Sequence, residues 1–203
     1  MERQSEVLSL ANESDLVLVG RRRTRSWLLP PLGRNARRAL QRSRTPVLVV
    51  GRKPIGAYKH VVVATDLKTD LTAALAWTGR VAPLAAVTLL HVYRPLFENK
   101  PAWAGATNEG IRQCRLAAQR EAAWSLATLL DRHPSLDPHP ALLSYGSATN
   151  DVARKSPDLG ADLVVMTRTK HSSWMDGLGA SVSAETTARA EDCDVLVVHE
   201  SSG

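Results

Sequence analysis

The sequence contains one pattern twice, and this repeat limits what the chain can fold into. Residues 14–50 and 161–200 each hold an apolar run, a polar loop, a helix-forming segment and a second apolar run. The second runs, 47–50 and 195–198, read VLVV in both copies. Self-similarity of this kind indicates repeated structural units. The chain is therefore expected to hold one complete α/β unit and part of a second.

Apolar runs alternate with helix-forming segments along the whole chain. The runs lack polar positions, which is typical of strands buried on both faces of a parallel sheet. Strands are expected at 16–19, 47–50, 60–64, 87–92, 141–145, 162–166 and 195–198, and helices at 35–42, 71–81, 108–132 and from Ser147 or Thr149 to 159. The longest helix is expected to bury part of a stripe made of Ile111, Leu116, Ala123, Leu126 and Leu130. Alternating strands and helices predict a three-layer α/β/α domain with a parallel, doubly wound sheet.

A ligand site is expected where strands of this sheet end. In doubly wound sheets, ligands bind beyond the carboxyl ends of the strands, at the point where the strand order reverses. Three residue pairs fall at such ends: Thr65 and Asp66, His91 and Val92, and Met166 and Thr167. His91 is interpreted as a structural histidine and Met166 as a core residue. Asp66 is open to two interpretations, a ligand contact or a cap of the loop that follows it.

Composition favours a cytoplasmic globular protein. The chain has 203 residues, of which 44% are hydrophobic, and no apolar run approaches the ~20 residues of a membrane helix. The first ten residues include acids and have no apolar core, so they do not predict a signal peptide. Cys114 and Cys193 make no disulfide framework. No Gly-x-Ser-x-Gly, His-Glu-x-x-His, Cys-x-x-Cys or paired-carboxylate motif occurs, so neither catalysis nor a metal site is predicted.

The positive charge is concentrated near the N-terminus. Residues 1–53 hold 12 Lys and Arg against 4 acids, whereas residues 54–203 hold 14 against 16. Two arginine clusters lie between Arg21 and Arg44. This stretch is either a solvated basic face or a surface that binds polyanions such as nucleic acid. No RNA-binding motif with interleaved aromatic residues supports nucleic acid, which is therefore the last-ranked hypothesis.

Four stretches in this order resemble the universal stress protein family. They read HVVVATDLKTDLTAALAW, VTLLHVYRP, YGSATNDVARKSPDLGADLVVM and SVSAETTARAEDCDVLVV. The resemblance implies a tandem protein with a partial first domain over 1–50, a linker over 51–57 and a complete domain over 58–203. It implies a five-stranded, adenine nucleotide alpha hydrolase-like sheet. In this family the last strands of two domains commonly pair, which in a tandem chain would join 47–50 with 195–198, and the resemblance also implies a homodimer through last strands. Because a lone fragment has little core, residues 1–50 are expected to pack on the complete domain or on another chain.

The resemblance also allows the sequence to be compared with the ATP-binding motif of the family. Some members of the family bind ATP through Gly-x2-Gly-x9-Gly-Ser/Thr after the fourth strand, where glycines let backbone N–H groups approach phosphate. Here Thr167 and Lys170 stand at the first two glycine positions, and Arg23 replaces the second glycine in the partial copy. Asp66 matches the acid that contacts adenine. The candidate ligand-binding residues are Thr65, Asp66, Val92, Met166, Thr167, Lys170, Gly179, Ser181 and Val182.

Three functions remain open after the resemblance. The first is a non-enzymatic stress-response protein that acts through a homodimer and partners and has a degenerate nucleotide loop. The second is a stress protein that binds ATP or another adenine nucleotide as a signal. The third is polyanion binding through the N-terminal arginines.

Overall fold

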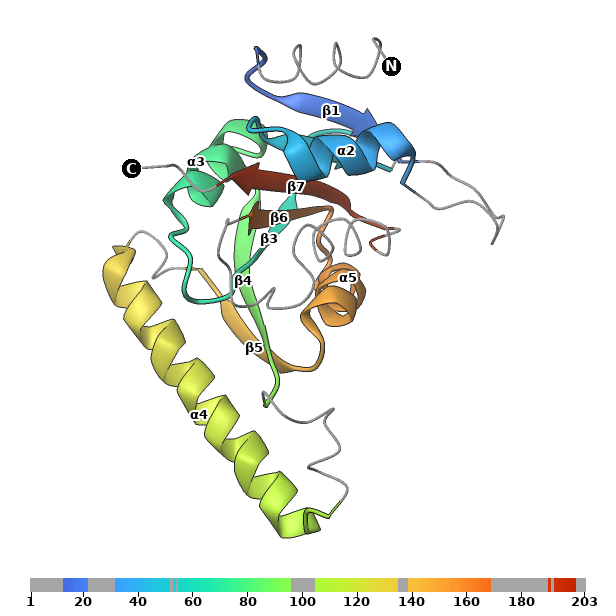
Figure 1. Ribbon diagram of the computed structural model, residues 1–203. Coiled ribbons are helices and arrows are strands. Elements are labelled where there is room, and N and C mark those ends of the chain that lie inside the picture. The colour runs from blue at the N-terminus through green and yellow to red at the C-terminus, as the bar shows by residue number, and fades with distance from the viewer. Residues whose placement is uncertain are drawn as a thin grey trace.

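A computed structural model describes residues 13–21, 32–51, 53, 55–95, 105–134, 139–168, 190 and 192–199. The described strands form one seven-stranded sheet in the order β1-β2-β7-β6-β3-β4-β5 (Figure 1). The strands are β1 (Val17–Gly20), β2 (Val47–Val50), β3 (His60–Ala64), β4 (Ala86–Tyr93), β5 (Ala141–Tyr145), β6 (Leu163–Arg168) and β7 (Asp194–His199). The helices are α2 (Arg34–Arg42), α3 (Thr72–Val81), α4 (Asn108–Arg132) and α5 (Ala148–Asp158).

The complete unit has the expected doubly wound sheet. Strands β3 to β7 are mutually parallel and lie in the order β5-β4-β3-β6-β7. The chain runs outward from β3 through β4 to β5, then crosses back to β6 on the other side of β3. The strand order therefore reverses between β3 and β6, which is where a ligand site is expected in such a sheet.

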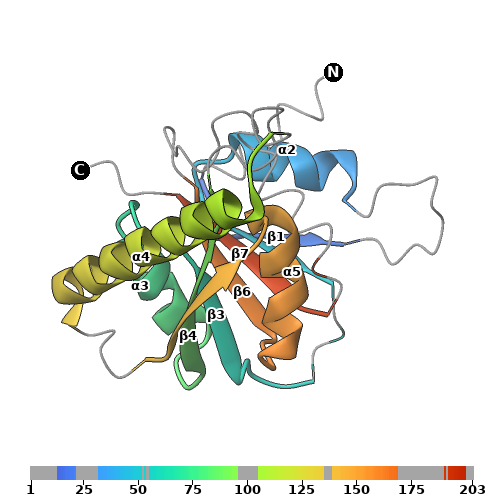
Figure 2. The same cartoon turned by 90° about the horizontal axis from the view of Figure 1, so that it is seen from below.

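Helices cover both faces of the sheet, as the strand sequences require. Helices α2 and α5 pack on one face, with Leu40 and Val152 in its core. Helices α3 and α4 pack on the other face, with Ala74 and Leu129 in its core. Figure 2 shows these two helical layers on opposite sides of the strands. This arrangement explains why the runs in β3, β6 and β7 are apolar at consecutive positions.

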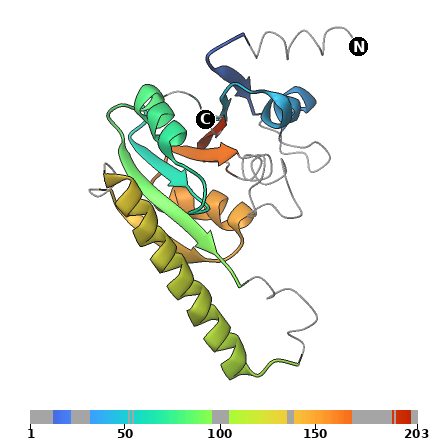
Figure 3. The same cartoon turned by 60° about the vertical axis from the view of Figure 1, so that its left-hand side comes forward.

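Helix α4 is longer than the sheet that it covers. Its 25 residues extend about 38 Å, and its N-terminal part projects past the strands (Figure 3). Ala122 and Leu129 are its buried residues, whereas Leu116 is 37% exposed and Trp124 73% exposed. The predicted stripe is therefore wrong for Leu116 and Ala123, which are both exposed: Leu116 lies in the N-terminal half of the helix, and Ala123 is exposed beside the buried Ala122. No helix in the described part of the chain combines the length and apolarity needed to cross a membrane.

The two copies of the repeat meet through their last strands. Strands β2 and β7 pair in antiparallel fashion, with Leu48 opposite Leu196 at the centre. Val47 lies opposite Val197 and Val49 opposite Val195, so the contact has local twofold symmetry in the register. This confirms the expected pairing of 47–50 with 195–198 and places both copies in one sheet.

This pairing corrects the predicted homodimer through the last strands. Strand β2 lies between β1 and β7, and β7 lies between β2 and β6. Neither strand has a free edge for another chain. The contact that the resemblance assigns to a dimer therefore occurs inside one chain.

Hydrogen bonds fasten the N-terminal strands and helix to the complete unit. The Arg21 guanidinium, just after β1, donates to the carbonyls of Ala190 and Cys193, and the Gly51 N–H, just after β2, donates to the buried Asp194 carboxylate at 2.8 Å. Arg168 Nη1 donates to the Leu40 carbonyl, near the end of α2, at 2.7 Å. The described part of residues 1–50 therefore packs on the complete domain, as expected.

Candidate functional site at the strand-order reversal

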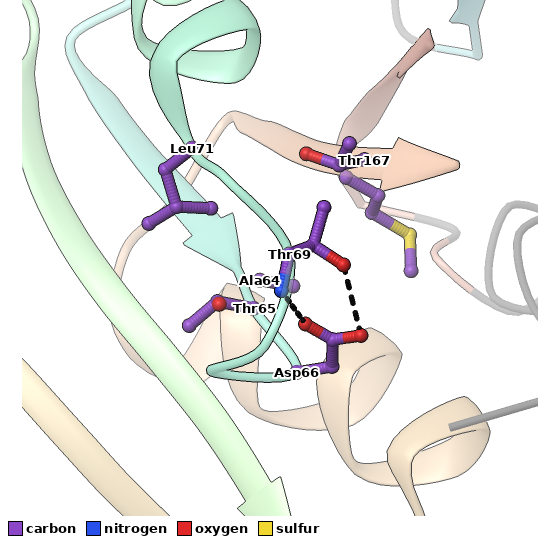
Figure 4. Close-up of a pocket in the computed structure, with 7 residues that line it drawn as sticks. Ala64, Thr65, Asp66, Thr69, Leu71 and Thr167 are labelled. Carbon is purple, nitrogen blue, oxygen red and sulfur yellow. Dashed lines mark hydrogen bonds between the residues drawn. The ribbon is translucent and has the colours of Figure 1, made fainter. Parts of the chain in front are cut away.

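A small cavity lies at the carboxyl ends of β3 and β6. Its volume is about 10 Å³, which is close to the space of a single water molecule. Figure 4 shows the residues around it, which come from the end of β3, the loop that follows and the end of β6. The lining residues are Ala64, Thr65, Asp66, Thr69, Leu71, Met166 and Thr167.

Asp66 organises the loop that leaves β3. One carboxylate oxygen accepts from the backbone N–H of Lys68 at 3.0 Å and of Thr69 at 2.8 Å. The other oxygen accepts from the Thr69 hydroxyl at 3.0 Å (Figure 4). Between them, Leu67 adopts a left-handed backbone conformation with φ 62°, which is uncommon for a side chain of this kind. The hydrogen bonds from Lys68 and Thr69 back to Asp66 span Leu67 and stabilise this tight turn.

Hydrogen bonds of Thr65 and His91 hold the backbone at the end of β3 in place. The Thr65 hydroxyl accepts from the Leu67 N–H at 2.9 Å, and the Thr65 carbonyl accepts from His91 Nδ1 at 2.8 Å. Burial lowers the pKa of His91, so the neutral ring is favoured. His91 therefore has the structural role that was predicted for it. It positions the backbone of the candidate site.

The β6 side of the cavity combines core and polar groups. Met166 is 2% exposed and belongs to the core that α2 and α5 cover, as predicted, while it also borders the cavity. The Thr167 Oγ1 atom is buried and has no hydrogen-bond partner in the described structure. An unsatisfied hydroxyl at a strand end costs free energy unless a ligand or water completes it.

The structure brings together four of the nine predicted site residues. Thr65, Asp66, Met166 and Thr167 line one cavity. Val92 does not line this cavity; it is 3% exposed and belongs to the core that α2 and α5 cover, so its predicted role stays a prediction. Strand β4 ends one residue later than predicted, so Val92 lies inside the strand. The remaining candidates, Lys170, Gly179, Ser181 and Val182, lie outside the described residues.

Three lining residues were not on the predicted list. Ala64 belongs to the apolar run of β3, and Leu71 has the apolar character of a core residue, so composition gives neither a functional signal. Thr69 lies in the loop between β3 and α3. Its spacing of three residues from Asp66, with donors at both its N–H and hydroxyl, is a recognisable Asx-turn pattern.

A second polar pair lies at the ends of β6 and β7. Arg168 and His199 are neighbours across these strands, on the face that α2 covers. Burial first, and the positive charge of Arg168 second, lower the pKa of His199 from its ordinary value of 6.5 to about 4. Burial also lowers the pKa of Arg168. His199 Nε2 is buried and lacks a partner in the ranges described.

The described arginines between Arg21 and Arg44 are not all accessible to a ligand. The Arg21 guanidinium turns inward and donates to the carbonyls of Ala190 and Cys193, so it is not available to a polyanion. Arg37 and Arg42 on α2 are exposed. The cluster members Arg22, Arg23 and Arg25 lie outside the described residues.

The described residues form neither a metal-binding cluster nor a disulfide bond. Within the described ranges, no three His, Cys, Asp or Glu side chains are placed to hold a metal ion. Cys114 is exposed on α4, whereas Cys193 is buried and its Sγ contacts the Ala161 carbonyl oxygen at 3.1 Å. The two cysteines are both free thiols.

The fold and the site define a class of protein. It is the class of doubly wound α/β domains with a strand-end site, here closed by a loop that Asp66 caps. The sequence profile of the Universal stress protein family matches residues 57–199, so the chain belongs to this family.

Solved structures share the fold at low sequence identity. A universal stress protein from Archaeoglobus fulgidus DSM 4304 aligns with 97% of this chain at 16% identity and a TM-score of 0.59. A functionally unknown protein from Pseudomonas aeruginosa PAO1 aligns with 97% at 15% identity and 0.64. The universal stress protein UspA from Lactobacillus plantarum aligns with 70% of this chain and 99% of its own at 20% identity and 0.52.

The lengths of these proteins differ from that of the present chain. The match covers 65% of the Archaeoglobus fulgidus chain and 67% of the Pseudomonas aeruginosa chain. No curated protein matches the sequence.

Proposed function

We propose that this chain is a non-catalytic stress-response protein that acts by assembling with partners and does not use a family-type ATP site. The observation that carries this proposal is the geometry of Asp66. Both of its carboxylate oxygens accept hydrogen bonds from its own loop, at Lys68 and Thr69. A carboxylate used in this way is less available to an adenine ring.

Two further observations support the proposal. The described residues beside Asp66 enclose space for about one water molecule, which is far less than a nucleotide fills. Thr167 and Lys170 occupy positions where glycines would let backbone N–H groups approach a phosphate, and each carries a Cβ. Membership of the universal stress protein family supplies the stress-response context.

Calorimetric titration with ATP and AMP tests the proposal directly. We expect no saturable heat at millimolar nucleotide and no phosphate release from ATP over hours. An Asp66→Asn variant should behave in the same way, because it keeps an acceptor for the loop. Saturable binding by the native chain that the Asp66→Asn variant loses would contradict the proposal, and so would sustained ATP hydrolysis.

The second candidate function is adenine-nucleotide binding as a signal. Thr167 Oγ1 favours it, because this buried hydroxyl lacks a partner in the described structure and borders the cavity. If it contacts a nucleotide, Thr167→Val should weaken binding about tenfold while the folded chain keeps its stability. Native mass spectrometry of the purified protein gives the complementary measurement. The absence of any bound nucleotide, together with a flat titration, would exclude this candidate.

A further inference from the structure

An arginine stands at the end of the first strand in both copies of the repeat. Strands β1 and β2 pair in the same register as β6 and β7: the residue opposite the first valine of VLVV is Val17 in one copy and Val164 in the other. Arg21 lies four residues after Val17, and Arg168 lies four residues after Val164. The two arginines therefore occupy equivalent positions, and their contacts can be compared directly.

Each of these arginines donates to the other copy, across the antiparallel contact of β2 with β7 (the seam). Arg168 Nη1 donates at 2.7 Å to the carbonyl of Leu40, the third residue from the end of α2. The Arg21 guanidinium donates to the carbonyls of Ala190 and Cys193, which precede β7. In both directions the acceptor belongs to the segment before the last strand, on the face that α2 and α5 cover. The contacts are therefore reciprocal and follow the local twofold relation of β2 and β7.

The position and charge of the two arginines make these contacts strong. The last carbonyls of a helix have no N–H partner within it and carry partial negative charge, which suits a guanidinium at the end of α2. Hydrogen bonds from a charged donor are roughly twice as strong as neutral ones. Arg21 and Arg168 are both partly buried, so water competes less for their acceptors. Because β2 and β7 are antiparallel, the two contacts lie at opposite ends of the seam, which itself pairs only three residues with three.

The residue beside the arginine differs between the two copies. Gly51 follows β2 next to Arg21, and a Cβ at Gly51 would overlap the Arg21 guanidinium. His199 holds the equivalent place beside Arg168. The guanidinium is the far end of a flexible side chain, so a methyl group at Gly51 would displace the guanidinium and not the backbone. The Gly51 N–H would still donate to Asp194.

We infer that the reciprocal contacts of Arg21 and Arg168 hold the seam closed and make it a unit that opens separately from the rest of the sheet. While both contacts are made, β2 and β7 cover each other's edges. Loss of either contact lets the seam open locally before the complete domain unfolds. An open seam exposes the backbone groups of two apolar strands, so the arginines also limit access to these edges. This role is separate from the proposed function and does not depend on the cavity at Asp66.

Hydrogen exchange of the full chain, followed by mass spectrometry, tests this role. Arg21→Met and Arg168→Met each keep an aliphatic side chain but remove the donors. Each should speed the exchange of the backbone amides on both sides of the seam, in 34–50 and 194–199, at least tenfold. The amides of 60–93, in β3, α3 and β4, should change less than twofold. The double variant should exceed either single variant at the seam.

Two further variants make the test specific. Gly51→Ala keeps both arginines but displaces the Arg21 guanidinium, so it should speed exchange at the seam as Arg21→Met does, and it also serves if an arginine variant fails to fold. Arg112→Met is the matched control, because Arg112 pairs with Glu109 on the exposed surface of α4 and should leave the seam unchanged. Unchanged exchange at the seam in Arg168→Met and Gly51→Ala would overturn the inference. So would an equal rise in 34–50 and 60–93, because the arginines would then stabilise the whole fold and not the seam.

Discussion

Replacement of His199 should reduce the sensitivity of this fold to acid. His199 ends β7 beside Arg168 of β6, and its Nε2 atom is buried without a partner in the described structure. Burial and then the Arg168 charge lower the pKa of its ring from 6.5 to about 4. The folded protein therefore binds this proton less tightly than the unfolded chain does.

The sign of the effect follows from that difference. Above pH 6.5 the ring is neutral in both states, and its contribution to stability is fully present. As the pH falls from 6.5 to 4, the unfolded chain takes up a proton that the folded chain does not, so the free energy of unfolding decreases. The full shift corresponds to about 3.4 kcal/mol at 1.36 kcal/mol per pKa unit. Because His199 is only partly buried, solvent screening reduces this to roughly 1.5–2 kcal/mol.

Urea denaturation of the native chain and of His199→Gln, at pH values between 7 and 4, measures this term. Glutamine keeps a polar group of similar size but does not titrate. The native chain should lose roughly 1.5–2 kcal/mol more than the variant over this range, while other acid-sensitive groups such as His91 affect both chains equally. An Arg168→Met variant should show a smaller acid loss than the native chain, because the repelling charge is gone. Parallel stability curves for the native chain and His199→Gln would refute the reasoning.

Three further outcomes follow from the contacts described above. Tyr58→Phe should lower the free energy of unfolding by about 1–2 kcal/mol in chemical denaturation, because the hydroxyl bonds to the buried carboxylate of Asp194. Asp66→Ala should cost about 1–2 kcal/mol, since it removes the acceptor of three hydrogen bonds in the loop, whereas Asp66→Asn should cost less; equal effects of the two would argue against the capping role. A thiol reagent should modify the exposed Cys114 within minutes and the buried Cys193 only under unfolding conditions, as mass spectrometry of the labelled chain can show. Rapid double labelling of the folded protein would contradict this packing.

The secondary structure and the fold class were predictable because they depend on local patterns. The strands of the complete unit are continuous apolar runs, since both of their faces are covered by helices. The bounds predicted for β2, β3, β5 and α4 agree with the structure residue by residue. Strands β2 and β5 each lie between a proline and a glycine, Pro46 and Gly51 for β2 and Pro140 and Gly146 for β5, which limits where they can start and stop. The pairing of 47–50 with 195–198 was predictable as well, from the family that the sequence resembles.

The role of each side chain at the site could be determined only from the tertiary structure. Asp66 was open to two interpretations, and only the loop geometry shows that its oxygens bond to Lys68 and Thr69. Val92 follows the same strand-end pattern as Thr65, but it belongs to the core that α2 and α5 cover and does not line the cavity. Arg168 and His199 lie far apart in the sequence, and the pairing of β6 with β7 makes them neighbours.

The sequence by itself therefore determined the family, the parallel sheet and the strand ends at which a site forms. These features depend on periodicity and on the order of apolar runs, which local residue types encode. The tertiary structure decided that the dimer-type contact of the last strands lies within one chain and that β1 lies beside β2 at the end of the described strand order. Both facts depend on which strands become neighbours. Strand order arises from packing the whole chain into one sheet, and no single segment specifies it.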